Sequence, residues 1–386
     1  MTESAAEILF WISTGLLAYV YVGYPLVVFI ASVLFPRHVR RETIEPTVTV
    51  LITAFNEEAA IRQKIENTLA IEYPSVKLEV LVASDGSSDR TESIVLEYAE
   101  RGVRLFRQEG RAGKTVTQNN AVMRATGDVI LFSDATTEYD ADVLRRLLPA
   151  FADETVGCVA GRLVYLDKAG SSVGSGAKSY WNYETFLRSA ESDACSLIGA
   201  SGCLYAVRRS AYEAMYPEAC SDFLICTALY RKGLRSVFEP DAVCFEHTNS
   251  RPADEFNMRV RVIMQTYTDL WRNRDMINPF KSGFFSLEMI SHKWLRYAVP
   301  LMLATIFISN ALLAYFNDLY DIVFAAQVIF YASAAAGWIL ERSGRHIMPL
   351  SIPLYFVLAN LASVVAFFRF VKGERTTTWE PVRGEQ

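Results

Sequence analysis

Three apolar segments of strand character each end at polar residues of the kind that bind nucleotides or metal ions. The segment 129–132 is followed by Ser133-Asp134-Ala135-Thr136, and the segment 78–83 is followed by Ser84-Asp85. A third segment, 48–52, is followed by Thr53-Ala54-Phe55-Asn56-Glu57. In an open α/β sheet, ligands bind beyond the carboxyl ends of the strands. These three strand ends therefore predict one nucleotide pocket.

The two aspartates can divide the work of such a pocket. A divalent metal that bridges a diphosphate needs hard oxygen ligands, and a nucleoside needs an acceptor for the donors of its base or ribose. The alternative is that Asp85 and Asp134 each only cap the helix that follows. For Asp134 the acid-rich stretch 138–142 already offers caps, which favours a functional role.

The stretch Arg111-Ala112-Gly113-Lys114-Thr115 lies between an expected strand and an expected helix. A phosphate loop of the ATPase type needs a glycine five positions before Gly113, and that position is Gln108. This excludes the ATPase motif. Arg111 and Lys114, near a helix N-terminus, can still neutralise a pyrophosphate.

Asp222 follows Cys220-Ser221 and begins an expected helix. It can serve as an N-cap, or as a carboxylate base that deprotonates an acceptor hydroxyl. The local pattern leaves both roles open. Gly199-Ala200-Ser201-Gly202, a little earlier in the chain, predicts a flexible loop.

Together these segments resemble the inverting family 2 glycosyltransferases in both order and spacing. The resemblance covers about residues 47–250, and the layout of apolar segments extends it toward the cellulose, chitin and hyaluronan synthase-like branch. The motifs that carry it are residues 53–57, Ser84-Asp85-Gly86-Ser87-Ser88-Asp89, Gly113-Lys114 with Asn119, residues 133–136, residues 199–202, and Ser221-Asp222.

The resemblance implies a GT-A-type enzyme that moves a hexosyl or N-acetylhexosaminyl group from a nucleotide-diphospho sugar, in particular a UDP-sugar, with inversion. It implies that Asp222 is the catalytic base and that Asp134 and Thr136 hold Mg²⁺ or Mn²⁺ on the diphosphate. The expected nucleotide-sugar contacts are Ala54, Glu57, Asp85, Arg111, Lys114 and Asp134, and the expected acceptor contacts are Gly199, Ser201, Gly202 and Arg261.

Two positions depart from the family pattern. The second acid of the metal-binding motif is Thr136 here, and the Q-x-x-R-W segment of processive synthases is reduced to Arg261 within residues 258–262. Two alternatives to single-sugar transfer therefore stay open. One is a processive polysaccharide synthase, and the other is a non-catalytic glycosyltransferase-like subunit of a membrane synthase complex.

Strand and helix patterns alternate from residue 47 to about 165, which predicts an α/β fold with a mostly parallel sheet and helices on both faces. Helices are expected at about 58–69, 90–101, 114–125 and 141–151. The helix from residue 90 is expected to take Ser87, Ser88 or Asp89 as its N-cap. Further strands are expected at about 103–106, 159–165, 204–208, 236–239 and 242–246.

The first apolar segment predicts a membrane anchor. No charged residue occurs from Ile8 to Phe35, which exceeds the roughly 20 apolar residues that span a bilayer. The start, Met1-Thr2-Glu3-Ser4, lacks the basic region of a cleavable signal peptide. Arg37, His38, Arg40 and Arg41 follow, so this end, and with it the next domain, is expected on the cytosolic side of the plasma or inner membrane.

Three further apolar segments, at about 298–316, 322–340 and 347–368, pose a conflict of topology. Three crossings after a cytosolic domain put the C-terminus outside. Basic residues nevertheless follow both the second segment (Arg342, Arg345) and the third (Arg369, Lys372, Arg375), which favours an inside location for both. Pro349 and Pro353 make the last segment the one expected to be broken or re-entrant.

The expected organisation is an anchor (1–36), a cytosolic GT-A domain (42–252), amphipathic interfacial helices (253–296), membrane segments (297–371) and a polar tail (372–386). An ordinary packed helix remains the alternative for 253–296. The net charge of −5 gives no sign of nucleic-acid binding. The six cysteines form no CxxC pair and are expected to be buried thiols. The expected partners are the donor, a lipid-linked or growing glycan acceptor, membrane lipids and proteins of a synthase complex.

Overall fold

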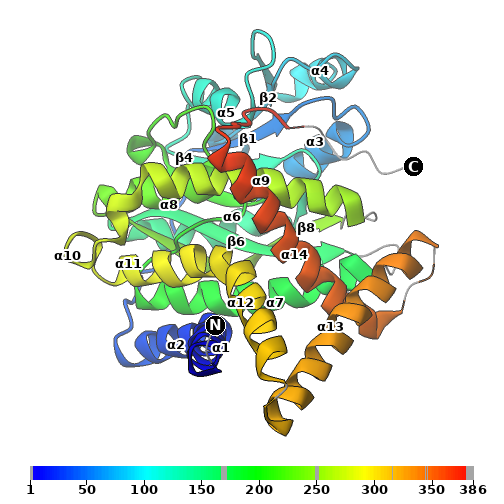
Figure 1. The fold of residues 1–386 in the computed structure, drawn as a ribbon. Helices are drawn as coiled ribbons and strands as arrows, with labels where there is room; N and C mark the ends of the chain where they lie inside the picture. Colours follow the sequence, from blue (N-terminus) through cyan, green and yellow to red (C-terminus); the bar gives the residue numbers. More distant parts are fainter. Residues whose placement is uncertain are drawn as a thin grey trace. The chain divides into compact units, whose positions relative to one another are not determined.

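The computed structural model describes residues 3–166, 172–247, 252–314, 316–343, 345 and 347–379. The chain divides into two compact units (Figure 1). The helical unit comprises Met1–Ile30, Asp167–Tyr180 and Asn249–Glu374, and the sheet unit comprises Ala31–Leu166, Trp181–Thr248 and Arg375–Gln386. The last segment of the chain therefore belongs to the sheet unit and not to the helices that precede it.

The sheet unit contains an eight-stranded mixed sheet in the order β3-β2-β1-β4-β7-β6-β8-β5. Its strands are β1 (Val48–Ala54), β2 (Leu78–Ser84), β3 (Val103–Arg107), β4 (Val129–Asp134), β5 (Glu138–Tyr139), β6 (Val156–Leu166), β7 (Tyr205–Arg208) and β8 (Arg235–His247). The four strands from β3 to β4 are parallel, and β7 pairs antiparallel with both of its neighbours. The predicted α/β sheet is confirmed, and β8 is one strand where the sequence predicts two short ones.

The register of the parallel strands brings their polar ends together. Thr53 on β1 lies opposite Asp134 on β4, and Ala54 lies opposite Ser84 on β2. Because these strands run in the same direction, the residues that follow them all emerge at one edge of the sheet. This is the arrangement that the three sequence motifs predict.

Helices cover both faces of the sheet because the central strands bury both faces. All seven residues of β1 are buried, which is typical of a strand between two helical layers. One face packs on α3 (Ile61–Leu69), α4 (Thr91–Leu96) and α6 (Val143–Leu147), and the other packs on α5 (Lys114–Val122) and α8 (Ser221–Arg231). Helix α4 begins at Thr91 with Arg90 as its N-cap, so the expected cap by Ser87, Ser88 or Asp89 is wrong. Asp89 nevertheless accepts hydrogen bonds from the N–H and hydroxyl of Thr91.

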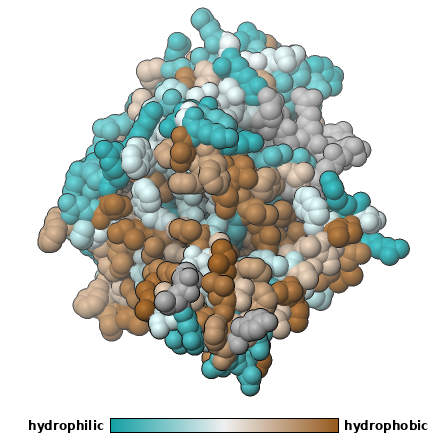
Figure 2. All heavy atoms as spheres, viewed as in Figure 1, coloured by the Kyte–Doolittle hydropathy of each residue, from teal (hydrophilic) through white to brown (hydrophobic). Residues whose placement is uncertain are grey.

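The remaining helices are α1 (Glu3–Ala18), α2 (Tyr24–Leu34), α7 (Ser172–Ala194), α9 (Pro252–Arg272), α10 (Pro279–Ser282), α11 (Phe284–Glu288), α12 (Arg296–Leu313), α13 (Asp318–Arg342) and α14 (Met348–Val371). Among the described residues, four helical stretches are long and apolar enough to cross a membrane, namely Glu3–Leu34, Phe284–Leu313, Asp318–Arg342 and Met348–Val371. Each overlaps one of the four predicted apolar segments, but the second begins at Phe284 and so includes residues that the sequence assigns to an interfacial helix. Figure 2 shows hydrophobic side chains exposed over α11, α12 and α14.

Within the helical unit, α9 packs against α14. Val260, Ile263, Met264 and Tyr267 of α9 form one buried cluster with Ala362 and Ala366 of α14. The apolar face of α9, which the sequence assigns to a membrane surface, is therefore partly covered by another helix of this chain. The interfacial role of residues 253–296 stays a prediction.

Candidate active site

The loops after β1 and β2 are tied to each other at the edge of the sheet. Asn56 has a φ of 53°, and its side-chain oxygen accepts a 2.8 Å hydrogen bond from the N–H of Ser88. The N–H of Glu57 donates to the Thr91 hydroxyl at 2.8 Å. Ala54 is buried and Glu57 is half-buried beside this junction. Their contact with a nucleotide stays a prediction, but both lie at the expected edge.

Asp85 holds the N-terminus of α5. Its Oδ1 accepts hydrogen bonds of 2.8 Å from the N–H of Ala112 and the hydroxyl of Thr117, and the N–H of Gly113 lies 3.0 Å from both carboxylate oxygens. The side chain is fully buried. The sequence analysis considered that Asp85 caps the next helix along the chain, which is α4. In the structure Asp85 instead holds the start of α5, which follows strand β3.

Residues of the C-terminal segment lie against the same loop. Thr377 is so close to Gly113 that a Cβ on this glycine would lie 2.0 Å from the Thr377 carbonyl oxygen. The rings of Trp379 and Phe55 meet edge to face with centroids 5.9 Å apart. The Arg111 guanidinium lies 3.9 Å from the Phe55 ring centroid and donates to the carbonyl oxygen of Trp379. Residues 377–379 therefore cover the Phe55 and Arg111 side of the pocket.

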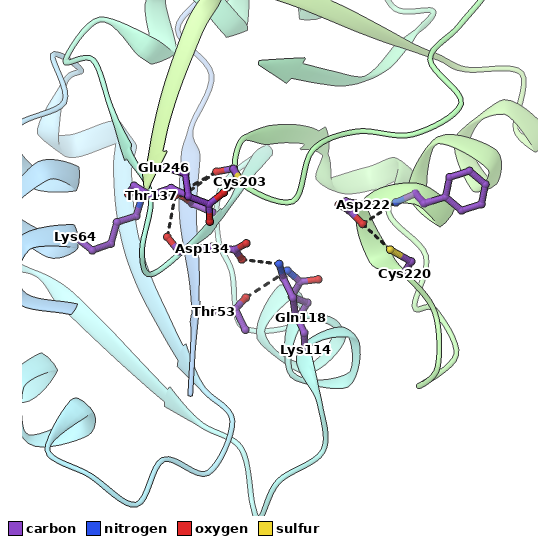
Figure 3. A network of polar contacts seen from close by, with 12 residues as sticks. Thr53, Lys64, Lys114, Gln118, Asp134, Thr137, Cys203, Cys220, Asp222 and Glu246 are labelled. Atoms are coloured by element: carbon purple, nitrogen blue, oxygen red, sulfur yellow. Dashed lines mark hydrogen bonds and ion pairs between the residues drawn. The ribbon is translucent and has the colours of Figure 1, made fainter. Parts of the chain in front are cut away.

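Three charged side chains from three elements converge near Gly202 (Figure 3). Lys114 Nζ lies 2.5 Å from Asp134 Oδ1. A Cβ on Gly202 would lie 3.2 Å from both Lys114 Nζ and Asp222 Oδ2, and 3.6 Å from Asp134 Oδ2. Burial lowers the pKa of the Lys114 ammonium, but the carboxylates of Asp134 and Asp222 outweigh burial and raise that pKa above its ordinary value. The lysine therefore stays charged between two carboxylates.

Asp222 sits in the first turn of α8 with its carboxylate at this centre. Its Oδ1 accepts a 3.0 Å hydrogen bond from the N–H of Phe223 and another from the Cys220 thiol. The carbonyl of Asp222 accepts a 2.8 Å bond from the N–H of Ala200, which ties the loop 199–202 to α8. The N-cap of α8 is Cys220, so the N-cap alternative for Asp222 is wrong. The role of Asp222 as a base stays a prediction.

The predicted acceptor residues fall into both units. Gly199, Ser201 and Gly202 lie beside Asp222 in the sheet unit, whereas Arg261 lies on α9 in the helical unit. The structure brings the three loop residues to the predicted catalytic base. The role of Arg261 stays a prediction.

Asp134 and Thr136 can contribute to a divalent metal site that is completed by substrate. The side chain of Asp134 is 28% exposed and that of Thr136 is exposed at the end of β4. Among the residues that the structure describes, no three His, Cys, Asp or Glu side chains cluster as a metal cage. Mg²⁺ is commonly held by one or two carboxylates, waters and substrate phosphates. One carboxylate beside a hydroxyl fits that manner of binding.

Lys64 is a residue of the site region that the sequence motifs do not reveal. It lies on α3, only 1% exposed, and donates hydrogen bonds to Ser133 Oγ (2.7 Å) and to the carbonyl oxygen of Thr137 (2.6 Å). Its ammonium also lies 3.8 Å from the centroid of the Tyr139 ring. Burial lowers the pKa of Lys64 to about 7. In the sequence, Lys64 is visible only as a charged residue that interrupts the apolar face of an amphipathic helix. Nothing in that pattern marks it as a residue of the site.

None of the six cysteines forms a disulfide and all are buried, as expected, although the Cys220 thiol belongs to the site through its hydrogen bond to Asp222. A cavity of about 520 Å³ is lined by residues 43–45 and 72–74, which lie before β1 and β2, and by Leu144, Arg145, Leu148 and Pro149 of α6 and the turn after it. Its position separates it from the convergent charges.

Comparison with known proteins places residues 49–215 in the family model described as Glycosyl transferase family 2. The beta-monoglucosyldiacylglycerol synthase of Trichormus variabilis is 34% identical over 133 residues, which is 33% of this chain and 28% of that protein. The poly-beta-1,6-N-acetyl-D-glucosamine synthase of Staphylococcus aureus is 26% identical over 250 residues, which is 63% of this chain and 60% of that protein. The chain thus matches less than two thirds of the length of either relative.

Among solved structures, a mannosyltransferase from Pyrobaculum calidifontis in complex with GDP-Man and Mn²⁺ superposes with a TM-score of 0.73 at 22% identity. The alignment covers 95% of this chain and 100% of that one. This likeness confirms the GT-A-type fold together with its flanking helices.

Lys64 predicts a pH dependence of stability. Its pKa is about 7 in the folded protein and 10.5 in a solvated chain, so between these values the unfolded state binds the proton that the folded state lacks. The contribution of Lys64 to the free energy of unfolding therefore rises with pH over this window, by about 1.4 kcal/mol per unit at most. It is constant below about pH 7, where both states are protonated.

The measurement compares thermal unfolding of wild type and Lys64→Met in one detergent from pH 6 to 9. The difference in stability between the two should shift in favour of wild type as pH rises above 7. Lys77→Met, which removes an exposed ammonium paired with Glu45, is the matched control and should show no such trend. Parallel pH profiles of wild type and Lys64→Met would contradict the shifted pKa.

Proposed function

We propose, from the match of residues 49–215 to the family 2 glycosyltransferase model, that the chain is a membrane-bound inverting glycosyltransferase. It moves a sugar from a nucleotide-diphospho sugar, in particular a UDP-sugar, to a lipid-linked or growing glycan acceptor. The observation that carries the proposal is the convergence of Lys114, Asp134 and Asp222 around Gly202. This arrangement sets a cation and a candidate base beside one small residue.

Asp222 is the base in this proposal. Its carboxylate takes the proton of an acceptor hydroxyl as the acceptor oxygen attacks the anomeric carbon of the donor. The new carbon–oxygen bond forms while the bond to the diphosphate breaks, and the nucleoside diphosphate leaves with that electron pair. Gly202 leaves room for the sugar because any side chain there would approach Asp222 and Lys114 to 3.2 Å.

Lys114 and Arg111 stabilise the leaving diphosphate at the N-terminus of α5, where backbone N–H groups and a positive helix end favour anions. Bound Mg²⁺ or Mn²⁺ would add charge neutralisation there, held by Asp134 and Thr136. Electrostatic stabilisation of a developing anion is commonly the largest catalytic contribution.

Two relatives support a lipid or glycan acceptor, since their names describe a glucolipid synthase and a polysaccharide synthase. The four apolar helices support an acceptor at a membrane. A processive synthase is the second candidate because of the likeness to the polysaccharide synthase. The reduction of Q-x-x-R-W to Arg261 favours single-sugar transfer.

The deciding experiment measures release of nucleoside diphosphate from a panel of nucleotide sugars by the full chain in lipid nanodiscs. Mg²⁺ or Mn²⁺ is supplied, with and without membrane lipid extract. Release from one donor that depends on metal supports the enzyme, and product length separates single transfer from polymerisation. Release from no donor by folded protein would instead support the non-catalytic subunit.

Asp222→Asn should lower turnover by about 10²- to 10⁴-fold, the usual contribution of a general base. The amide keeps the size of the carboxylate and can still accept from the N–H of Phe223, so donor affinity should change less than threefold. Turnover is measured with the donor identified above, and affinity by calorimetry with its nucleoside diphosphate. Asp241→Asn, an exposed carboxylate on β8, is the control. Wild-type turnover in Asp222→Asn would show that another group is the base.

Lys114→Met should have effects of opposite sign on two ligands. Nucleoside diphosphate binding should weaken by about tenfold or more, since a charge-assisted contact to phosphate is lost. Binding of Mn²⁺ alone should tighten, because the ammonium now 2.5 Å from Asp134 Oδ1 no longer competes for that carboxylate. Electron paramagnetic resonance measures free Mn²⁺, and Lys77→Met controls for net charge. Unchanged affinity for both ligands would remove Lys114 from the site.

The tail contacts support a specific membrane topology. If all three later spans crossed, residues 377–379 and the sheet unit would lie on opposite sides of the membrane, yet Trp379 contacts Phe55. Two crossings, by the stretch that ends at Leu313 and by α13, put both on one side. Arg342 and Arg345 then lie on the same cytosolic side as Lys372, in agreement with the positive-inside rule. On this proposal α14, with Pro353 inside it, is re-entrant or interfacial and rests on α9.

Single-cysteine labelling tests this topology in intact cells. A membrane-impermeant maleimide should label Asn317→Cys, in the turn between α12 and α13, from outside. It should label Arg345→Cys only after permeabilisation. The six native cysteines are buried and should give little background. Lys372→Cys, which follows α14, should likewise be labelled only after permeabilisation, and external labelling at this position would mean that α14 crosses the membrane.

A further inference from the structure

The ammonium of Lys64 is buried, and the Tyr139 ring and the carboxylates of Asp134 and Glu138 offset the cost of its burial only in part. Its hydrogen-bond partners are the hydroxyl of Ser133 and the carbonyl and hydroxyl oxygens of Thr137, all neutral groups. The side chain is 1% exposed, so almost no water reaches it. Burying an ammonium costs several kcal/mol unless a counter-charge lies close. A methionine would fill a similar volume without this cost, so stability alone is a weak reason for a lysine here.

The hydrogen bonds of the Lys64 ammonium go to the turn that carries the predicted metal ligands. Ser133 immediately precedes Asp134, and Thr137 immediately follows Thr136. The ammonium therefore joins the two ends of a five-residue turn from behind, at 2.7 and 2.6 Å. Within the turn, the Thr137 hydroxyl also donates to the carbonyl oxygen of Asp134 at 3.0 Å. Figure 3 shows Lys64 on one side of this turn and Lys114 on the other.

We propose that Lys64 is a positioning residue of the active site, which clamps the turn Ser133–Thr137 so that Asp134 and Thr136 face the donor diphosphate. The proposal rests on the proposed function for the identity of the ligand. The clamp itself rests on the two contacts across the turn. Because Lys64 reaches the turn from behind, it acts through Asp134 and does not touch the donor.

The clamp has a second anchor that supports this role. The Ser133 hydroxyl lies 3.2 Å from the carbonyl oxygen of Cys203, the residue after Gly202. The Lys64 ammonium, the β4 turn and the loop at Gly202 thus form one continuous set of contacts. A shift of the turn would move Asp134 relative to both Gly202 and Lys114.

Charge and positioning make opposite predictions for Lys64→Met, which makes the test sharp. Removal of a cation near Asp134 would by charge alone tighten Mn²⁺ binding. Loss of the clamp would weaken it, because the ligands then sample several orientations. At pH 6.5, with Mn²⁺ as the only ligand, we expect the dissociation constant of Lys64→Met to rise about tenfold. Lys77→Met is the control for net charge, and its value should stay within twofold of wild type.

Amide hydrogen exchange tests the clamp without any ligand. Peptides that cover residues 129–139 should exchange at least tenfold faster in Lys64→Met, while peptides from β1 and β6 stay at the wild-type rate. Ser133→Ala removes one of the two contacts and is the milder variant if Lys64→Met unfolds. It should show a smaller change at the same peptides. Unchanged exchange at 129–139 in the folded variants would overturn the clamp.

Kinetics with the donor identified above complete the test. A clamp predicts that the half-saturating Mn²⁺ concentration and the KM for donor rise about tenfold, with a smaller fall in kcat. Values within twofold of wild type for both variants would overturn the positioning role. A wild type that turns over no donor would contradict the proposed function instead, and hydrogen exchange would then decide the clamp by itself.

Discussion

The buried carboxylate of Asp85 accepts hydrogen bonds from Ala112, Gly113 and Thr117, and this fixes the N-terminus of α5 against the end of β2. On the other side of the site, the buried ammonium of Lys64 fixes the turn after β4. Both charges lie behind the surface that would meet a ligand. They hold Lys114 and Asp134 only 2.5 Å apart, although these residues come from separate elements. The exposed charges of the site depend on the buried ones for their positions.

The ends of the strands and the acidic residues that follow them could be predicted from the sequence because local residue patterns determine both. A run of apolar residues that stops at Asp134 needs only a parallel sheet to place the acid at an edge, and the register of β1 with β4 provides it. Asp222 could be found from the sequence because it lies at the start of an apolar helix. The direction of the central strands and the helices on both faces follow from the same alternation of elements.

Contacts between segments that are distant in the sequence could not be predicted in this way. The partner of Asp85 is a helix more than 25 residues away, and a carboxylate at a strand end gives no sign of which helix it caps. Lys64 interrupts an apolar face, and only the fold shows that the turn at Ser133 receives it. The contact of Trp379 with Phe55 brings the C-terminal segment next to a residue near the start of the sheet unit. Without this contact, the basic residues on both sides of α14 favour a cytosolic location for both of its ends, and charge patterns alone cannot say how α14 meets that requirement.

The replacement of the second metal-binding acid by Thr136 can be understood from the charges around it. Asp134 and Asp222 face Lys114 on the open side, while Lys64 adds a second cation behind the turn. A further carboxylate at position 136 would favour a metal held by the protein alone. With a hydroxyl there, Lys114 already offsets part of the charge of the two carboxylates before any ligand enters. The diphosphate must then bring much of the negative charge that attracts a metal, so metal and nucleotide are expected to bind as a pair.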